Sequence, residues 1–288
     1  MKLKTNPNVN KTQLAKDLGV SRSSLYYKPK REQIDQEVKA QIESVMIDNP
    51  SYGHKRISIA LKLNKKRIRR VMKKYGLKPY RTRYKPQKPD DLGKPETGYP
   101  NLIKAFCPIQ PNIVWATDFT YIKYRNRFIY LATVIDIYTR EILGWNISRY
   151  HNKHLVLGAL RDATERTKTK PMYAHSDQGS EYDSESYEAF CQREGIQISM
   201  SKKGSPWENA FQESFYSGFK TDLCDPDNFE ILGKLVEAIN HSICYYNNKR
   251  IHTKLKMSPV QFREKYQKVM ETVAVSYTHL TLPTNREV

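Results

Sequence analysis

Three acidic residues stand at positions where the sequence could assemble a metal-dependent active site. Asp118 lies in the segment WATDFTYI, Asp177 in HSDQGSEY and Glu213 in NAFQESFYSGFK. Carboxylates that converge to ~4 Å repel by roughly 4 kcal/mol per pair at an effective dielectric constant near 20, and a divalent cation reverses the sign of that interaction. Because the candidate ligands are all oxygens and no cysteine stands near them, they favour Mg²⁺ or Mn²⁺ over zinc.

The spacing of these residues supports a common site. Between Asp177 and Glu213 lie 35 residues, and Lys220 follows Glu213 by seven residues. Seven residues are two turns of a helix, so we expect Lys220 on the same helix face as Glu213.

Other polar and aromatic residues near these positions have competing interpretations. Asp136, in VIDIYTR, is interpreted as a structural residue rather than a metal ligand. His175 precedes Asp177 by two residues, and packing beside the site is favoured over metal binding. Trp207, in a Ser-Pro-Trp segment, is expected to pack in a core, with stacking on a terminal or flipped base as the alternative.

The elements that must position the carboxylates follow from the change of hydrophobic period along the chain. Strands are predicted over 114–121, 127–136 and 141–148, joined as an antiparallel meander. Helices at 154–166, 184–194 and 209–223 then alternate with strands at 172–175 and 196–201. This order predicts an α/β catalytic core over 110–223, with a mixed sheet flanked by helices.

A C-terminal helical extension over 224–274 is predicted to follow the core. One helix is expected over 227–246, where Asp227 and Glu230 have the spacing of a capping box. A second is expected to begin at Ser258-Pro259, an N-cap followed by proline in the first turn. Residues 275–288 show no helical or strand periodicity and are interpreted as a non-native tail, the translation of a cloning or sequencing adaptor.

Positive charge is concentrated before the core. The whole chain has 288 residues and a formal charge of +19, and residues 1–100 contain 25 basic against 9 acidic side chains. In the segment 64–75, Ile68, Val71 and Met72 are expected to pack in a core, and most of the other residues are basic. Since Asp and Glu are absent between Asp48 and Asp90, these cations cannot all find acidic partners nearby, and we expect them to lie along DNA phosphates. An ordinary solvated face is the alternative. These candidate DNA contacts are Lys65, Lys66, Arg67, Arg69, Arg70, Lys73 and Lys74.

Two helical DNA-binding segments are predicted in this basic part. Residues 1–30 are expected to form a helix-turn-helix, with Leu14, Ala15 and Leu18 on one face and Gly19 at the turn. Its second helix, capped by Ser21, would present Arg22 and Ser23 to DNA bases. An ordinary helical hairpin is the alternative. Residues 31–83 are expected to form a second helix-turn-helix-like segment, whose first helix carries an apolar stripe of Ile34, Val38, Ile42 and Val45.

Composition excludes several classes of protein. Six prolines over 78–110 predict an extended linker, placed at 84–109. No apolar run is long enough for a membrane span, and the N-terminus lacks the apolar core of a secretory signal. Four separated cysteines without a CxxC pair favour reduced thiols, so a cytoplasmic location beside the bacterial nucleoid is expected.

The chain resembles the transposases of bacterial insertion sequences, specifically the second-frame (OrfB) type of the IS3 family. The motifs that carry the resemblance are WATDFTYI, VIDIYTREILGW, HSDQGSEY, GSPWENAFQESFYSGFK and YYNNKRIHTKLKMSPVQF. The segment 52–74 is similar to the helix-turn-helix that precedes the core in that family. The resemblance implies a ribonuclease H-like fold, similar to retroviral integrases, with a mixed five-stranded sheet.

It also implies roles for individual residues. Asp118, Asp177 and Glu213 would be the catalytic carboxylates that hold two Mg²⁺ or Mn²⁺ ions, and Lys220 would help to hold the DNA end. The activity implied is cleavage at terminal inverted repeats and strand transfer by the freed 3′-hydroxyl. The implied partners are double-stranded DNA of the element ends and the target, further copies of the chain, and a protein from an upstream frame.

The sequence departs from the family pattern at two acidic residues. Glu208 stands where the family often has Asp, and Glu181 stands where an uncharged residue is frequent. Two alternatives to an active transposase stay open at this point. One is a non-catalytic DNA-binding remnant or regulator of transposition, and the other is a ribonuclease H-type nuclease without transfer activity.

Overall fold

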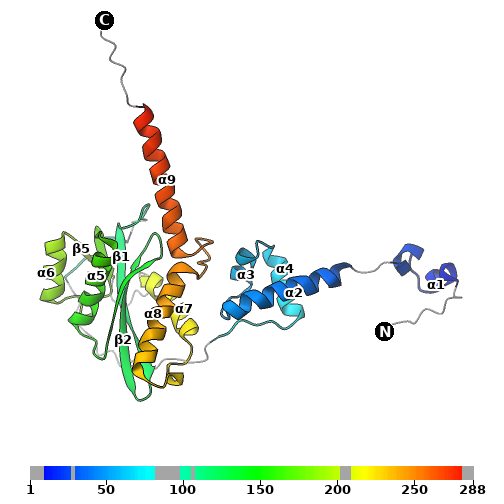
Figure 1. The fold of residues 1–288 in the computed structure, drawn as a ribbon, viewed down its shortest axis with the longest axis horizontal. Coiled ribbons are helices and arrows are strands. Elements are labelled where there is room, and N and C mark those ends of the chain that lie inside the picture. The colour runs from blue at the N-terminus through cyan, green and yellow to red at the C-terminus, as the bar shows by residue number, and fades with distance from the viewer. Residues whose placement is uncertain (1–9, 27–29, 82–97, 105–107, 202–208, 281–288) are drawn as a thin grey trace, which may run out of the picture.

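A five-stranded mixed sheet forms the centre of the α/β core, between helices on its two sides (Figure 1). The computed structural model describes residues 10–26, 30–81, 98–104, 108–201 and 209–280. The strand order is β3-β2-β1-β4-β5, and β1, β2 and β3 are antiparallel neighbours, whereas β4 and β5 run parallel to β1. The bounds are β1 Val114–Tyr124, β2 Arg127–Asp136, β3 Ile142–Ser148, β4 Tyr173–Ser176 and β5 Gln197–Met200. The predicted ribonuclease H-like sheet is confirmed.

Helices cover both faces of this sheet (Figure 1). On one face, α5 (Lys153–Thr167) and α6 (Glu185–Glu194) pack on a core that includes Trp115 of β1 and Val134 of β2. On the other face, α7 (Ala210–Leu223) and α8 (Leu232–Asn248) pack on a core that includes Val114 and Ile122 of β1. Since side chains alternate along a strand, the even-numbered residues of β1, Asp118 among them, belong to the face that α7 covers.

The C-terminal elements differ from the expectation at two points. The helix expected from residue 227 begins at Leu232, and a short 3₁₀ helix, η3 (Pro226–Asn228), precedes it. The Asp227 carboxylate does not cap α8, because it accepts a hydrogen bond from the backbone N–H of Arg125 at the end of β1. The last helix, α9 (Pro259–Leu280), begins after Ser258 as expected but continues six residues past position 274. The helix thus includes residues 275–280, where the sequence shows no helical periodicity.

A separate small core forms before the sheet. It contains α2 (Lys30–Asp48), α3 (His54–Ala60) and α4 (Lys65–Lys74), packed around Val38, Ile42, Tyr52, Ile57, Ile68, Val71 and Met72. The predicted stripe on α2 is wrong at its first position, because Ile34 is 44% exposed and the neighbouring Asp35 is 1% exposed. Asp35 is buried because it pairs with basic side chains of α4.

The first predicted DNA-binding segment is only partly helical. α1 (Lys11–Asp17) is followed by Gly19 in the left-handed conformation, as the turn requires. The second helix was expected to be α-helical, but residues Arg22–Tyr26 form a 3₁₀ helix, η1. The Ser21 hydroxyl lies 2.8 Å from those of Ser23 and Ser24, and such local hydrogen bonds compete with α-helical ones.

Most of the predicted linker lies outside the described residues, which include only 98–104 and 108–109 of 84–109. In the part of the chain that the structure describes, no helix combines the length and apolarity that crossing a bilayer requires.

Candidate active site

Asp118 and Asp177 stand on adjacent parallel strands at the same level of the sheet. Ala116 of β1 is paired with His175 of β4, so Asp118 and Asp177 each follow this pair by two residues. Asp118 is half-buried, and its Oδ1 accepts a hydrogen bond from the Phe119 backbone N–H at 2.8 Å. Asp177 is exposed just after β4 ends. The parallel pairing of β1 with β4 thus brings the two carboxylates to the same edge of the sheet.

A tight turn holds the Asp177 side chain. The Gly179 backbone N–H donates to Asp177 Oδ1 at 3.1 Å. A Cβ at position 179 would lie 3.1 Å from that same oxygen and 2.9 Å from Glu181 Oε2. A larger residue at this position would therefore push the Asp177 and Glu181 carboxylates aside.

Glu213 is an exposed residue in the first turn of α7, and a buried polar network fixes this helix to the sheet. Gln212 is fully buried, and its amide nitrogen donates to the carbonyl oxygens of Ala116 at 2.7 Å and Thr133 at 3.1 Å. The Tyr216 hydroxyl donates to the carbonyl oxygen of Asp118 at 2.7 Å and lies 2.8 Å from Thr133 Oγ1. The residues before and after Glu213 thus tie its helix to the strand of Asp118.

Electrostatic interactions show that the three carboxylates share one environment. Burial is the main cause that raises the pKa of Asp118 well above its usual value, and the negative charges of Asp177 and Glu213 raise it further. The Phe119 N–H and the Lys220 charge oppose this shift. A buried carboxylate with like charges near it is stabilised by a cation.

The donor set fits a hard divalent cation in type and charge, because it consists of carboxylate oxygens alone. Among the described residues, no three acidic, histidine or cysteine side chains already stand as close together as a bound ion requires. The carboxylates are therefore near enough to influence one another without forming a compact cluster.

Lys220 faces the same region from the third turn of α7. Its Nζ lies 4.8 Å from the centre of the Tyr121 ring of β1. Partial burial lowers the pKa of Lys220, and the charge of Asp118 raises it. Lys220 thus contacts an aromatic ring beside the carboxylates, and in the part of the chain that the structure describes it makes no ion pair of its own.

The competing residues near the site have structural roles. Asp136 is buried, and its carboxylate accepts from the backbone N–H groups of Thr139 at 2.6 Å and Asn112 at 2.7 Å. His175 is fully buried, with Nδ1 3.0 Å from Ser199 Oγ of β5. These contacts agree with the interpretation of both as packing residues. Trp207 and Glu208 lie outside the described residues.

The unexpected acid Glu181 is buried beside the Asp177 turn. Its Oε1 lies 3.0 Å from His151 Nδ1, and the His151 ring stacks at 8° on that of Phe119. Glu181 therefore has a partner of its own next to the candidate site.

Two basic side chains of α4 form ion pairs with acids that lie far from them in the sequence. Arg70 makes a two-point ion pair with Asp35 at 2.5 and 2.6 Å, and Lys74 contacts Glu32 and Asp35. The Arg70 hydrogen bond is the main cause that lowers the pKa of Asp35 to about 2. Only these two of the seven cations have acidic partners within the described residues, and α2 supplies those acids from an earlier part of the chain.

The other predicted DNA contacts are solvent-exposed. They are Lys65, Lys66, Arg67, Arg69 and Lys73 on α4, and Arg22 and Ser23 on η1. None of the five on α4 makes an ion pair within the described residues, so this face of α4 offers uncompensated positive charge to a polyanion.

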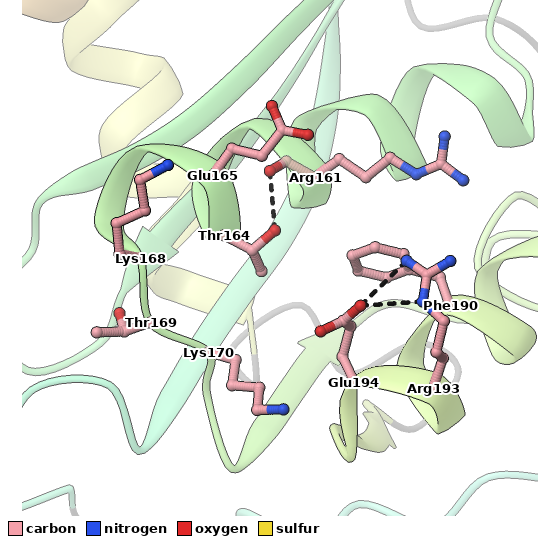
Figure 2. A pocket seen from close by; sticks show the side chains of 9 residues that line it. All are labelled: Arg161, Thr164, Glu165, Lys168, Thr169, Lys170, Phe190, Arg193 and Glu194. Carbon is pink, nitrogen blue, oxygen red and sulfur yellow. Dashed lines mark hydrogen bonds and ion pairs between the residues drawn. The ribbon is translucent and has the colours of Figure 1, made fainter.

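A hollow of about 700 Å³ lies elsewhere, between the ends of α5 and α6 (Figure 2). Phe190 forms part of its wall, with Arg161 on one side and Arg193, paired with Glu194, on the other. Because these helices cover the face of the sheet opposite α7, the hollow is separate from the carboxylates.

The residues that sequence reasoning missed are those of the buried network, Gln212, Tyr216 and Thr133. One sequence signal could have found two of them: the amide of Gln212 and the hydroxyl of Tyr216 are four residues apart, on a helix whose neighbouring positions are aromatic. Their partners are strand carbonyls and a threonine about 80 positions earlier, which no local pattern reveals.

Comparisons with known proteins agree with the fold and the motifs. One integrase core domain family matches residues 108–206, and a second matches residues 194–259. The transposase for insertion sequence element IS904 of Lactococcus lactis is 34% identical over 252 residues, which are 84% of this chain and 99% of the relative. The putative transposase InsK for IS150 of Escherichia coli is 30% identical, over 85% of this chain and 90% of the relative.

Among solved structures, the HTLV-2 integrase catalytic core domain in complex with magnesium aligns at 19% identity and a TM-score of 0.45, over 54% of this chain and 98% of that chain. The extent of the match to IS904 transposase establishes the family. The chain belongs to the bacterial insertion-sequence transposases of the IS3 family, whose catalytic part is an integrase core domain.

Proposed function

We propose that Asp118, Asp177 and Glu213 are the catalytic carboxylates of this DNA transposase and that they hold Mg²⁺ or Mn²⁺. The observation that carries the proposal is the pairing that brings the three acids into one region. Asp118 and Asp177 each follow a paired position of the parallel strands β1 and β4 by two residues. Gln212 and Tyr216 fix the helix of Glu213 to the strand of Asp118. The raised pKa of Asp118 agrees with this, because burial is its main cause and the charges of Asp177 and Glu213 add to it. Structural carboxylates are ordinarily placed beside cations or N–H donors, as Asp136 is, and not beside each other.

The reaction is an in-line attack on a phosphodiester. A water oxygen attacks the phosphorus at the element end, the bond from phosphorus to the 3′-oxygen breaks, and a 3′-hydroxyl is released. That hydroxyl then attacks a phosphodiester of the target, so one bond forms for each bond broken. Bound divalent ions supply the charge that activates the attacking oxygen and stabilises the leaving one.

The residues of this chain have distinct parts in that reaction. The three carboxylates hold the ions, and the network of Gln212 and Tyr216 keeps Glu213 in register with Asp118. Lys220, beside Asp118, holds a phosphate of the DNA end. The exposed cations of α4, together with Arg22 and Ser23, contact DNA outside the active site. The protein acts as a multimer on DNA, is made with a protein from an upstream frame and is found at the nucleoid.

Cleavage of labelled terminal-repeat DNA tests the proposal. Purified protein with Mg²⁺ is expected to release a 3′-hydroxyl end, and Asp177→Asn is expected to bind the same DNA without cleaving it. Ser180→Ala is a matched control in the same turn, since its side chain is exposed and is not among the three acids. Binding without cleavage by the wild type would favour a regulator of transposition. Degradation of RNA–DNA hybrid with no preference for the repeats would favour a nuclease.

A further inference from the structure

Two motifs of this chain have no part in the carboxylate site, and the structure brings them together along α7. They are VIDIYTR, which ends at Arg140 between β2 and β3, and YYNNKRIH, which contains Arg250 and His252 after α8. The Arg140 guanidinium lies 3.9 Å from the centre of the Phe211 ring at the start of α7. The Arg250 Nε pairs with Asp222 Oδ2 at 2.5 Å near the end of the same helix.

These arginines lie on the side of α7 that faces away from the carboxylates. Phe211, Gly218 and Asp222 are spaced by seven and four residues and share one face of the helix. A Cβ at Gly218 would lie 3.3 Å from Arg250 Nη2, so Arg250 is pressed against this face. Glu213 follows Phe211 by two residues and therefore points about half a turn away.

A third arginine reaches this place from the α2–α4 core. Arg56 of α3 donates from Nε to the carbonyl oxygen of Ile251 at 2.9 Å, and the Tyr52 hydroxyl accepts from the Ile251 N–H at 2.7 Å. Arg56 and Arg250 are close enough for the charge of Arg250 to lower the pKa of Arg56, for which burial is the larger cause. Figure 1 shows α3 beside the turn that joins α8 to α9.

His252 lies among these cations as a neutral donor. Burial, and then the charges of Arg140, Arg56, Lys254 and Arg250, lower its pKa to about 4, so it is uncharged at neutral pH. Its Nδ1 is buried and has no hydrogen-bond partner among the described residues. A buried polar atom left in this state is destabilising unless a ligand or solvent completes it.

The balance of charge indicates an anionic ligand. Asp222 supplies one negative charge to a group in which Arg56, Arg140, Arg250 and Lys254 are positive. Arg140 also adopts a left-handed backbone conformation, with φ of 65°, which is uncommon for arginine and persists where the surroundings hold it.

We propose that Arg56, Arg140 and His252 hold a backbone phosphate of double-stranded DNA, with Arg250 fixed against Asp222 as an additional positive charge. The proposal rests on the function of the chain as a DNA transposase. DNA is favoured over an acidic protein because Arg56 belongs to α3, which packs against α4, and five exposed cations of α4 have no acidic partner among the described residues. The α2–α4 core and the catalytic core then bind one DNA molecule as a single surface.

The test is DNA binding by the full chain without divalent metal. Fluorescence anisotropy with a labelled terminal-repeat duplex in EDTA, over a series of salt concentrations, gives the affinity and its salt slope. Arg140→Gln is expected to lower the slope of log affinity against log salt by about 0.9, which is roughly an eightfold loss at 0.1 M salt. His252→Phe, which removes a donor and no charge, is expected to weaken binding with the slope unchanged.

Arg161→Gln is the matched control, because the Arg161 guanidinium also stacks on a phenylalanine, Phe190, but on the opposite face of the sheet. It is expected to bind as the wild type does. Arg140→Lys is expected to restore most of the slope that Arg140→Gln loses. Wild-type affinity and slope in both Arg140→Gln and His252→Phe would overturn the proposal, and if Arg140→Gln fails to fold, His252→Phe alone decides.

This test is separable from that of the carboxylates. A wild type that binds DNA but never cleaves it would contradict the proposed catalytic role and leave the phosphate site standing. A wild type that cleaves, together with unchanged binding by Arg140→Gln and His252→Phe, would remove the phosphate site alone.

Discussion

Removal of one hydroxyl from Tyr216 should separate the positioning of the active site from the stability of the fold. In Tyr216→Phe the side chain keeps nearly its full volume, but the carbonyl oxygen of Asp118 loses a donor at 2.7 Å. A buried acceptor left without its partner costs about 1–3 kcal/mol. For a domain of this size that is a fall in Tm of about 2–12 °C. Since the pKa of Tyr216 is raised by burial, its hydroxyl is a proton donor throughout the working pH range.

The matched control is Tyr124→Phe on the same strand. The Tyr124 hydroxyl also donates to a carbonyl oxygen, that of Phe229, at 3.0 Å. Tyr124 lies six residues beyond Asp118, which is about 20 Å along a strand. Both variants should lose a similar amount of stability, but only Tyr216→Phe removes a hydrogen bond made by the backbone of Asp118 itself.

The assay is single-turnover cleavage of terminal-repeat DNA at a temperature where both variants are folded, with Mg²⁺ varied. Tyr216→Phe is expected to cleave about tenfold or more slowly, the factor that 1.4 kcal/mol of lost transition-state stabilisation gives, and to need more Mg²⁺. Tyr124→Phe is expected to cleave at the wild-type rate. Equal rates in the two variants would refute the positioning role and leave Tyr216 a purely structural residue.

Three further predictions follow from named charges. Lys66→Gln should lower the slope of log DNA affinity against log salt by about 0.9. Lys74→Gln removes a cation that is already paired with acids, so it should change this slope less. Equal effects of the two variants would contradict the proposal that the exposed cations of α4 contact DNA phosphates. The pKa of Asp35 is lowered to about 2, so its ion pair stabilises the fold above pH 3.8 and this contribution is lost as the pH falls through 2. Asp35→Asn should therefore lower Tm at pH 7 and differ little from wild type below pH 2, as calorimetry can measure. Because the pKa of Asp118 is raised, protons compete with a metal ion for its carboxylate. Mg²⁺ should therefore raise Tm more at pH 8 than at pH 5. An Asp118→Asn variant with the same Tm response to Mg²⁺ would contradict this prediction.

The order of elements in the core could be predicted because each element has a clear local period. The predicted bounds of β2, residues 127–136, are those of the structure, since a continuous run of apolar and β-branched residues with a turn on each side defines them. The pairing of β1 with β4, which sets Asp118 level with Asp177, needed the resemblance to a family, because parallel pairing leaves no local signal.

The errors come from interactions between distant parts of the chain. Ile34 was expected to begin the buried stripe of α2, but Asp35 is buried in its place, because Arg70, 35 residues later, makes the burial of this acid favourable. Asp227 has the spacing of a helix cap, but the backbone of Arg125 at the end of β1 takes its carboxylate. In each case a tertiary partner overrode the local rule.

The most direct measurement of the central assignment is the position of a bound metal ion. A crystal grown with Mn²⁺ and terminal-repeat DNA gives anomalous scattering that locates the ion independently of activity. We predict Mn²⁺ within about 2.0–2.2 Å of carboxylate oxygens from Asp118, Asp177 and Glu213, beside the scissile phosphate. Mn²⁺ bound in the active complex without these three side chains, or on other acids such as Glu181, would contradict the account.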